Sequence, residues 1–79
     1  MPEMDIAEQV RTLLTTRFGV DPVSVTADAT LRKLGVDSLA LEELRLLIED
    51  GLEVDLEDAE LTPRNSFGQL LAAVHSAAA

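Results

Sequence analysis

The sequence predicts an all-α fold, a small helical bundle of three main helices plus one short helix, with a long loop after the first helix. Apolar residues make up 47% of the chain and aromatic residues only 3%, so Leu, Val, Ile and Ala must build the core, and such a composition favours helices. Three segments carry apolar residues at helical spacing. At 79 residues the chain is long enough for one core and too short for two, so we expect residues 1–79 to form a single domain.

The first helix is predicted within residues 3–18. Its apolar residues recur about every third or fourth position, which places them on one buried stripe. These residues are Ile6, Val10, Leu13, Leu14 and Phe18. Gly19 then ends the helix, because glycine readily adopts the left-handed conformation past a helix end. We expect Phe18 and Phe67 to be the large anchors of the core.

Residues 20–37 are predicted to form a long ordered loop with one short helical turn. The Asp21-Pro22 pair marks a turn, and the apolar residues that follow it are spaced for burial without a helical period. We expect these residues to pack on the core: Val23, Val25, Leu31 and Leu34. A connection of this length inside a compact domain is often functional.

The second helix is predicted to begin at Asp37 or Ser38, which are both good N-terminal capping residues. It should finish at Gly51, which suits the left-handed position past a helix end. A short helix is then expected near residues 56–61, with Asp55 as its cap.

The last helix is predicted to begin at Ser66. The run Ser66-Phe67-Gly68-Gln69 has the Ser and Gln spacing of a capping box, in which each side chain bonds the backbone N–H of the other residue. The apolar stripe of this helix consists of Phe67, Leu70, Leu71 and Val74.

The second helix carries two apolar groups on different sides. The core face consists of Leu41, Leu44, Leu47 and Ile48. Leu39 and Leu46 fall on the opposite side, and they are flanked by carboxylates on both edges: Glu42, Glu43, Glu49 and Asp50. Exposed apolar area supplies affinity and charges orient a partner, so we expect this face to dock other proteins. In the alternative, the loop or the short helix covers the two leucines, although the neighbouring acids make full burial costly.

The net charge of −9 is concentrated in the second half of the chain, where ten acids stand against only Arg45 and Arg64. Such a field repels nucleic acid and anionic membranes and speeds encounter with basic protein surfaces, although acidity also serves solubility alone. No apolar run approaches the roughly 20 residues of a membrane span, and the start of the chain is acidic where a signal peptide is basic. We therefore expect a cytoplasmic protein that contacts neither nucleic acid nor membrane.

Ser38 stands at the predicted start of the acidic helix and allows three interpretations. As a helix cap it needs no further function. As a hydrolytic nucleophile it needs a general base and an oxyanion hole, but His75 is the only histidine and no Gly-x-Ser-x-Gly motif is present, so we expect no catalytic residue. As the acceptor of a phosphate-linked group it is well placed, because free N–H groups and the helix dipole favour an anion there. With no Cys and a single His, no metal site is expected.

The residues around Ser38 resemble the acyl carrier protein family. The similar run is Asp28-Ala29-Thr30-Leu31-Arg32-Lys33-Leu34-Gly35-Val36-Asp37-Ser38-Leu39, and with the helices before and after it the similarity spans nearly the whole chain. In that family the serine that matches Ser38 carries 4'-phosphopantetheine, whose thiol holds acyl chains as thioesters. The cofactor would then supply the sulfur that a chain without cysteine lacks. The resemblance also implies that Asp37 helps to place the Mg²⁺ and the diphosphate of coenzyme A during attachment.

The same resemblance implies a set of partner proteins for a monomeric, stand-alone carrier. These are a phosphopantetheinyl transferase that uses coenzyme A, and ketosynthases, acyltransferases or other acyl-processing enzymes with basic docking surfaces. The family's partner-facing positions match Leu39, Glu43, Leu46, Glu49 and Asp50. These residues belong to the face derived above, which we expect to bind partners together with the adjacent Glu42.

The segments Ser38-Leu39-Ala40-Leu41 and Thr62-Pro63-Arg64 resemble discrete carriers of bacterial polyketide pathways. We therefore expect a role in polyketide biosynthesis. A fatty-acid carrier, a peptidyl carrier and an unmodified acidic adaptor module are the alternatives.

Overall fold

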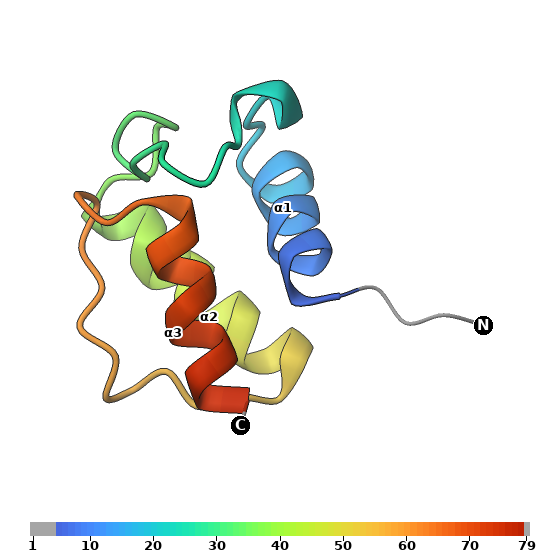
Figure 1. The fold of residues 1–79 in the computed structure, drawn as a ribbon, viewed down its shortest axis with the longest axis vertical. Coiled ribbons are helices and arrows are strands. Elements are labelled where there is room, and N and C mark those ends of the chain that lie inside the picture. Colours follow the sequence, from blue (N-terminus) through green and yellow to red (C-terminus); the bar gives the residue numbers. More distant parts are fainter. Residues whose placement is uncertain (1–4, 79) are drawn as a thin grey trace.

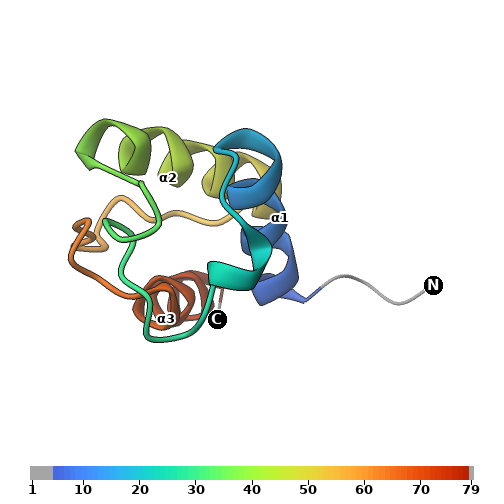
Figure 2. The ribbon, with the colours of Figure 1, turned by 90° about the horizontal axis from the view of Figure 1, so that it is seen from above.

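The computed structural model describes residues 5–78, and in this part of the chain it contains three α-helices and one short 3-10 helix (Figure 1). The elements in order are α1 (Ile6–Arg17), η1 (Pro22–Ser24), α2 (Ser38–Leu52) and α3 (Phe67–Ala78). Helix α1 packs against both α2 and α3, and Figure 2 shows the three helices grouped around one centre. The predicted all-α bundle with a long loop after its first helix is confirmed.

Helix α1 ends by the signal found in the sequence, whereas its cap, which lies inside the predicted range, was not predicted. The Asp5 side chain caps it by accepting a hydrogen bond from the Glu8 backbone N–H at 2.8 Å. Gly19 follows the helix with a φ of +67°, the left-handed value predicted for it. The first two residues of the predicted range, at positions 3 and 4, lie outside the described residues.

Helix α2 begins as predicted but ends later. Asp37 is its cap, with the Ala40 N–H donating to Asp37 Oδ1 at 2.8 Å. The predicted end at Gly51 is wrong, because the helix continues to Leu52, whose side chain packs against the core. Glu53 takes the left-handed conformation instead, at φ 55° and ψ 45°.

No helix forms at residues 56–61, so the expectation of a short helix there is wrong. The segment makes a single turn, in which the Ala59 N–H bonds the Leu56 carbonyl at 3.0 Å. Leu56 is fully buried and Ala59 and Leu61 pack against the core, but the other residues of the segment are exposed, so its apolar face is too narrow for tertiary packing to hold it as a helix. The fold's short helix is η1, where the single helical turn of the first loop was expected.

Helix α3 confirms the capping box. The Gln69 N–H donates to Ser66 Oγ at 3.1 Å, and the Ser66 N–H donates to Gln69 Oε1 at 2.9 Å.

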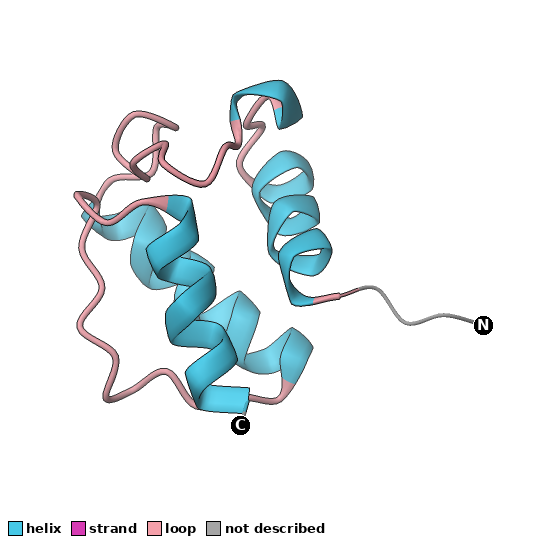
Figure 3. Ribbon diagram, viewed as in Figure 1, coloured by secondary structure: helices cyan, strands magenta, loops and turns pink. Residues whose placement is uncertain are grey.

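The core contains buried residues from all three α-helices and from both long connections, which Figure 3 draws as loops apart from η1. From the helices it takes Val10, Leu14, Leu41, Leu44, Ile48, Phe67, Leu70 and Val74, and from the connections Val20, Val25, Leu31, Val36 and Leu56. The loops therefore contribute to the hydrophobic core as well as linking helices, and their positions are fixed by burial.

Some predicted core positions are wrong or incomplete. Val23 is 84% exposed, because it lies in η1, and the chain enters the core before and after this turn, at Val20 and Val25. Phe67 is buried as expected, whereas Phe18 only packs against the edge of the core.

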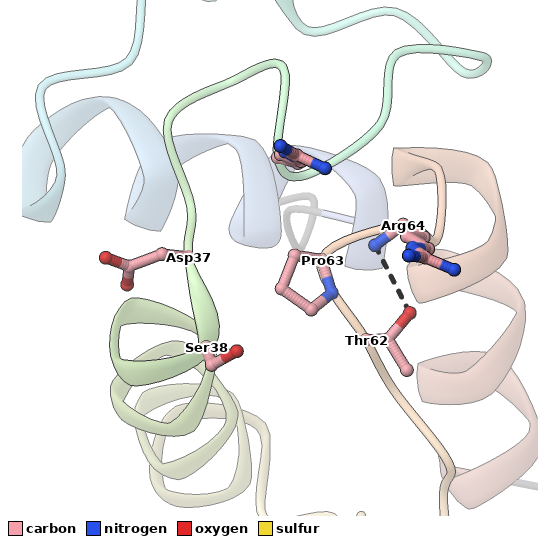
Figure 4. Close-up of a pocket in the computed structure, with 6 residues that line it drawn as sticks. Asp37, Ser38, Thr62, Pro63 and Arg64 are labelled. Carbon is pink, nitrogen blue, oxygen red and sulfur yellow. Dashed lines mark hydrogen bonds between the residues drawn. The ribbon is translucent and has the colours of Figure 1, made fainter.

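The two long connections are tied to one another at one end of the bundle. Thr30 and Ser66 form an antiparallel bridge. The Leu31 N–H donates to the Asn65 carbonyl at 2.9 Å, and the Arg32 N–H donates to the Pro63 carbonyl at 2.7 Å. These bonds hold the segment before α2 against the segment before α3, and the start of α2 lies next to this junction (Figure 4).

Candidate functional site

Ser38 is the first residue of α2 and its side chain is exposed. The interpretation of Ser38 as the helix cap is wrong, because Asp37 performs that function. No described residue accepts or donates a hydrogen bond at the Ser38 hydroxyl. The backbone N–H groups of Ser38 and Leu39 likewise have no partner within residues 5–78, as is usual in a first helical turn. A hydroxyl with no hydrogen-bond partner among the described residues therefore lies at the positive end of the α2 dipole.

A pocket of about 450 Å³ opens beside this hydroxyl. It is lined by Arg32, Asp37, Ser38, Thr62, Pro63 and Arg64. In Figure 4 the Ser38 oxygen points toward the segment of Thr62 and Pro63, while the Asp37 carboxylate points the other way. The Thr62 hydroxyl oxygen accepts the Arg64 N–H at 3.2 Å, which shapes the wall opposite Ser38.

A second pocket of about 290 Å³ shares three of these residues, Ser38, Thr62 and Pro63. It continues along α2 and is completed by Leu41, Glu42, Arg45 and Leu61. Ser38 therefore lies where two adjoining hollows meet, between α2 and the connection that precedes α3.

The two leucines predicted to face a partner are open to solvent. Leu39 is 82% exposed and Leu46 is 61% exposed, so the alternative in which the loop or a short helix covers them is wrong. Glu43 and Asp50 are also exposed on this helix. We call these four residues the docking face.

The other two predicted acids, Glu42 and Glu49, are engaged within the chain. Both oxygens of Glu42 accept from Arg45 Nη2, at 2.9 and 3.0 Å, so its charge is partly neutralised. Glu49 is half-buried, and its Oε2 accepts the Leu56 N–H at 2.8 Å. Glu49 thus fastens the segment after α2 to the helix.

Sequence reasoning missed the basic and loop residues that complete the first pocket. Arg32 comes from the segment before α2, and Pro63 and Arg64 come from the segment before α3. Their meeting depends on the bridge between Thr30 and Ser66, and no local pattern in the sequence indicates it.

Two structural findings concern other classes of site. No group of three His, Cys, Asp or Glu side chains suited to a metal ion occurs within the described range. Among the described helices, none has the length and apolar character to cross a membrane.

The chain matches a family model described as "Phosphopantetheine attachment site" over residues 8–74. It is 33% identical over 73 residues to an acyl carrier protein of Akkermansia muciniphila, an alignment that covers 91% of each chain. It is 39% identical over 59 residues to an acyl carrier protein of Guillardia theta, covering 73% of each chain. No solved structure matches it. The chain therefore belongs to the acyl carrier protein family, whose members carry a covalently attached 4'-phosphopantetheine group and are carriers rather than enzymes.

Proposed function

We propose that Ser38 is the attachment residue of the 4'-phosphopantetheine arm, and that residues 1–79 act as one carrier domain for acyl intermediates of polyketide biosynthesis. The observation that carries the first part is the exposed Ser38 hydroxyl, which has no hydrogen-bond partner among residues 5–78 and lies at the start of α2 beside a pocket. A hydroxyl that acts as a cap or lies in the core could not be offered to a modifying enzyme in this way.

Attachment transfers a phosphoryl group from coenzyme A. The Ser38 oxygen forms a bond to the phosphorus that bears the pantetheine, and the bond from that phosphorus to the bridging oxygen of the diphosphate breaks. Adenosine 3',5'-bisphosphate leaves with the bridging oxygen, and the hydroxyl proton passes to a base of the transferase. The chain's contribution is the position of the hydroxyl and the first-turn N–H groups, which favour the phosphate that results.

Asp37 holds the start of α2 in shape and also faces the transferase. Its Oδ1 accepts the Ala40 N–H, and no described residue bonds its Oδ2. We infer that this second oxygen helps to place the Mg²⁺ and the diphosphate of coenzyme A while the transferase is bound.

Acyl carrier proteins interact with a phosphopantetheinyl transferase and with acyl-processing enzymes. We infer that this chain presents the docking face, Leu39, Glu43, Leu46 and Asp50, to basic surfaces on these partners, including ketosynthases and acyltransferases. Glu42 contributes through its pair with Arg45, which makes this edge of the helix less acidic than the other edge. Glu49 contributes by holding the helix and the segment after it in place.

The assignment to a polyketide pathway is supported by the sequence around the site. Ala40 and Arg45 in α2, and the Thr62-Pro63-Arg64 segment that lines the pocket, distinguish the chain from the usual pattern of fatty-acid carriers. Loading the purified protein with malonyl, fatty acyl and aminoacyl groups, and offering each form to enzymes encoded beside it, distinguishes a polyketide carrier from fatty-acid and peptidyl carriers.

Intact-mass measurement tests the attachment residue. After incubation with coenzyme A and a promiscuous phosphopantetheinyl transferase, the native chain should gain the mass of one phosphopantetheine. Ser38→Ala should gain none, whereas Ser24→Ala, which removes an exposed hydroxyl from η1, should load normally. Failure of the native chain to load beside a control carrier contradicts the proposal and favours an unmodified adaptor. Loading of Ser38→Ala assigns the arm to another residue.

A further inference from the structure

The first pocket brings together two arginines that have no acidic partner in the part of the chain that the structure describes. Arg32 and Arg64 both line it, and neither forms an ion pair or a side-chain hydrogen bond within residues 5–78. The contrast with Arg11 and Arg45 is clear, because those arginines pair with Glu8 and Glu42. Arg17 and Lys33 also lack an ion pair within residues 5–78, so what distinguishes Arg32 and Arg64 is that both line the pocket that contains Ser38.

The pairing of the two long connections explains how the arginines meet. Thr30 lies opposite Ser66 in an isolated antiparallel bridge, and the Leu31 N–H donates to the Asn65 carbonyl at 2.9 Å. The Arg32 N–H donates to the Pro63 carbonyl at 2.7 Å, so the backbone of Arg32 lies beside the residue that precedes Arg64. Two arginines at one pocket, neither neutralised by a described acid, favour the binding of an anion there.

The remaining pocket residues suit a phosphate that bears an organic group. The pocket includes Ser38, and the N–H groups at the start of α2 add further donors for an anion. The one acid in the lining, Asp37, has Oδ1 bonded to Ala40, and its carboxylate points away from the Ser38 oxygen in Figure 4. The Asp37 charge therefore repels an anion in the pocket less strongly than a carboxylate that pointed into the pocket would.

We propose that Arg32 and Arg64 bind the phosphodiester that joins the 4'-phosphopantetheine arm to Ser38. This inference rests on the proposed function, because it requires the arm to be on Ser38. The two arginines act as positioning residues that restrict the start of the arm. Both are exposed, so the contact is modest in strength and is weakened by salt.

The test uses the chain loaded with its arm and the variants Arg32→Gln, Arg64→Gln and the double substitution. Lys33→Gln is the matched control. It removes one positive charge, as Arg32→Gln does, but Lys33 lines a different pocket. Intact mass first establishes that each protein carries the arm. If the native chain does not take up the arm, the proposed function is contradicted before the contact of the arginines is tested. Circular dichroism then establishes that each variant is folded.

Phosphorus nuclear magnetic resonance reads the contact directly. In the native loaded chain the phosphodiester resonance should differ from that of the same protein unfolded in urea, and salt should move it toward the unfolded value. The double variant should lose most of this difference and each single variant about half, while Lys33→Gln keeps it. The thermal midpoint of the native chain should also rise by a few degrees on loading, and this rise should be lost in the double variant.

Several outcomes would overturn the proposal. If the double variant has the native phosphorus resonance, the arginines are solvated side chains that leave the arm free. If it loads more slowly but shows the native resonance once loaded, the arginines serve the transferase and do not hold the arm. If Lys33→Gln changes the resonance as much as the double variant does, the effect is one of overall charge.

Discussion

The two ends of α2 carry similar residues and are organised in opposite ways. At the first end, Asp37 caps the helix, Ser38 is exposed, and two backbone N–H groups have no partner within the described chain. At the last end, the chain folds back on the helix, Glu49 binds the Leu56 N–H, and Leu56 is fully buried. One end is open to solvent, and the other is closed by its own connection.

This difference shows that an acid on α2 cannot be assigned to docking by its place in the sequence alone. Glu43 and Glu49 both flank the exposed leucines, yet Glu43 is exposed and Glu49 supports the fold. The closed end also explains why the docking face can be so open, because the stability of α2 depends on contacts at its other faces and at its far end.

The largest expected effect is at the closed end, in Leu56→Ala. Removing a fully buried leucine loses transfer energy and leaves a cavity, so the free energy of unfolding should fall by about 2–5 kcal/mol. In a domain this small, such a loss is a large share of the total stability. Urea unfolding followed by circular dichroism measures it.

Leu46→Ala is the matched control for Leu56→Ala, because it removes the same atoms from a side chain that is 61% exposed. It should change stability by less than about 0.5 kcal/mol and should weaken binding to a partner enzyme, as should Glu43→Lys. If Leu46→Ala or Glu43→Lys unfolds the domain, that side chain is structural and the docking face is wrongly assigned.

Glu49→Ala should have the next largest effect. It leaves the half-buried Leu56 N–H without its acceptor, so the free energy of unfolding should fall by about 1–3 kcal/mol. Glu49→Gln keeps an acceptor oxygen and should recover most of that loss, whereas Glu43→Ala should stay within about 0.5 kcal/mol of the native chain. Equal effects of Glu49→Ala and Glu43→Ala would remove the distinction between the two acids.

The sequence predicted the open end of α2 better than the closed end. Asp37 as a possible cap and the exposure of Leu39 and Leu46 follow from local rules, since a cap and a helical face depend only on nearby residues. The bond from Leu56 to Glu49 and the meeting of Arg32 with Arg64 join segments that are apart in the chain, and they depend on tertiary packing.

Asp37→Ala tests the open end, with a smaller effect on stability. Loss of the cap should lower the free energy of unfolding by about 1 kcal/mol, while Asp37→Asn keeps an acceptor and should lose only a few tenths. Ser38→Ala should leave stability within about 0.5 kcal/mol of native while abolishing attachment of the arm. A large loss of stability in Ser38→Ala would mean that the hydroxyl has a structural partner.

The smallest effect is expected at Glu53, the residue that turns the chain at the closed end. Its φ of 55° is unfavourable for a residue with a side chain, and glycine adopts it freely. Glycine also gains freedom in the unfolded chain, which offsets part of the benefit, so Glu53→Gly should raise the free energy of unfolding by about 0.5 kcal/mol. The control Gly51→Ala replaces a helical glycine that has open space around its Cβ position, and it should stabilise α2 by a similar amount through helix propensity. If Glu53→Gly destabilises the domain, the Glu53 side chain makes a contribution that outweighs its backbone strain, and the closed end depends on more than the Glu49 bond and the burial of Leu56.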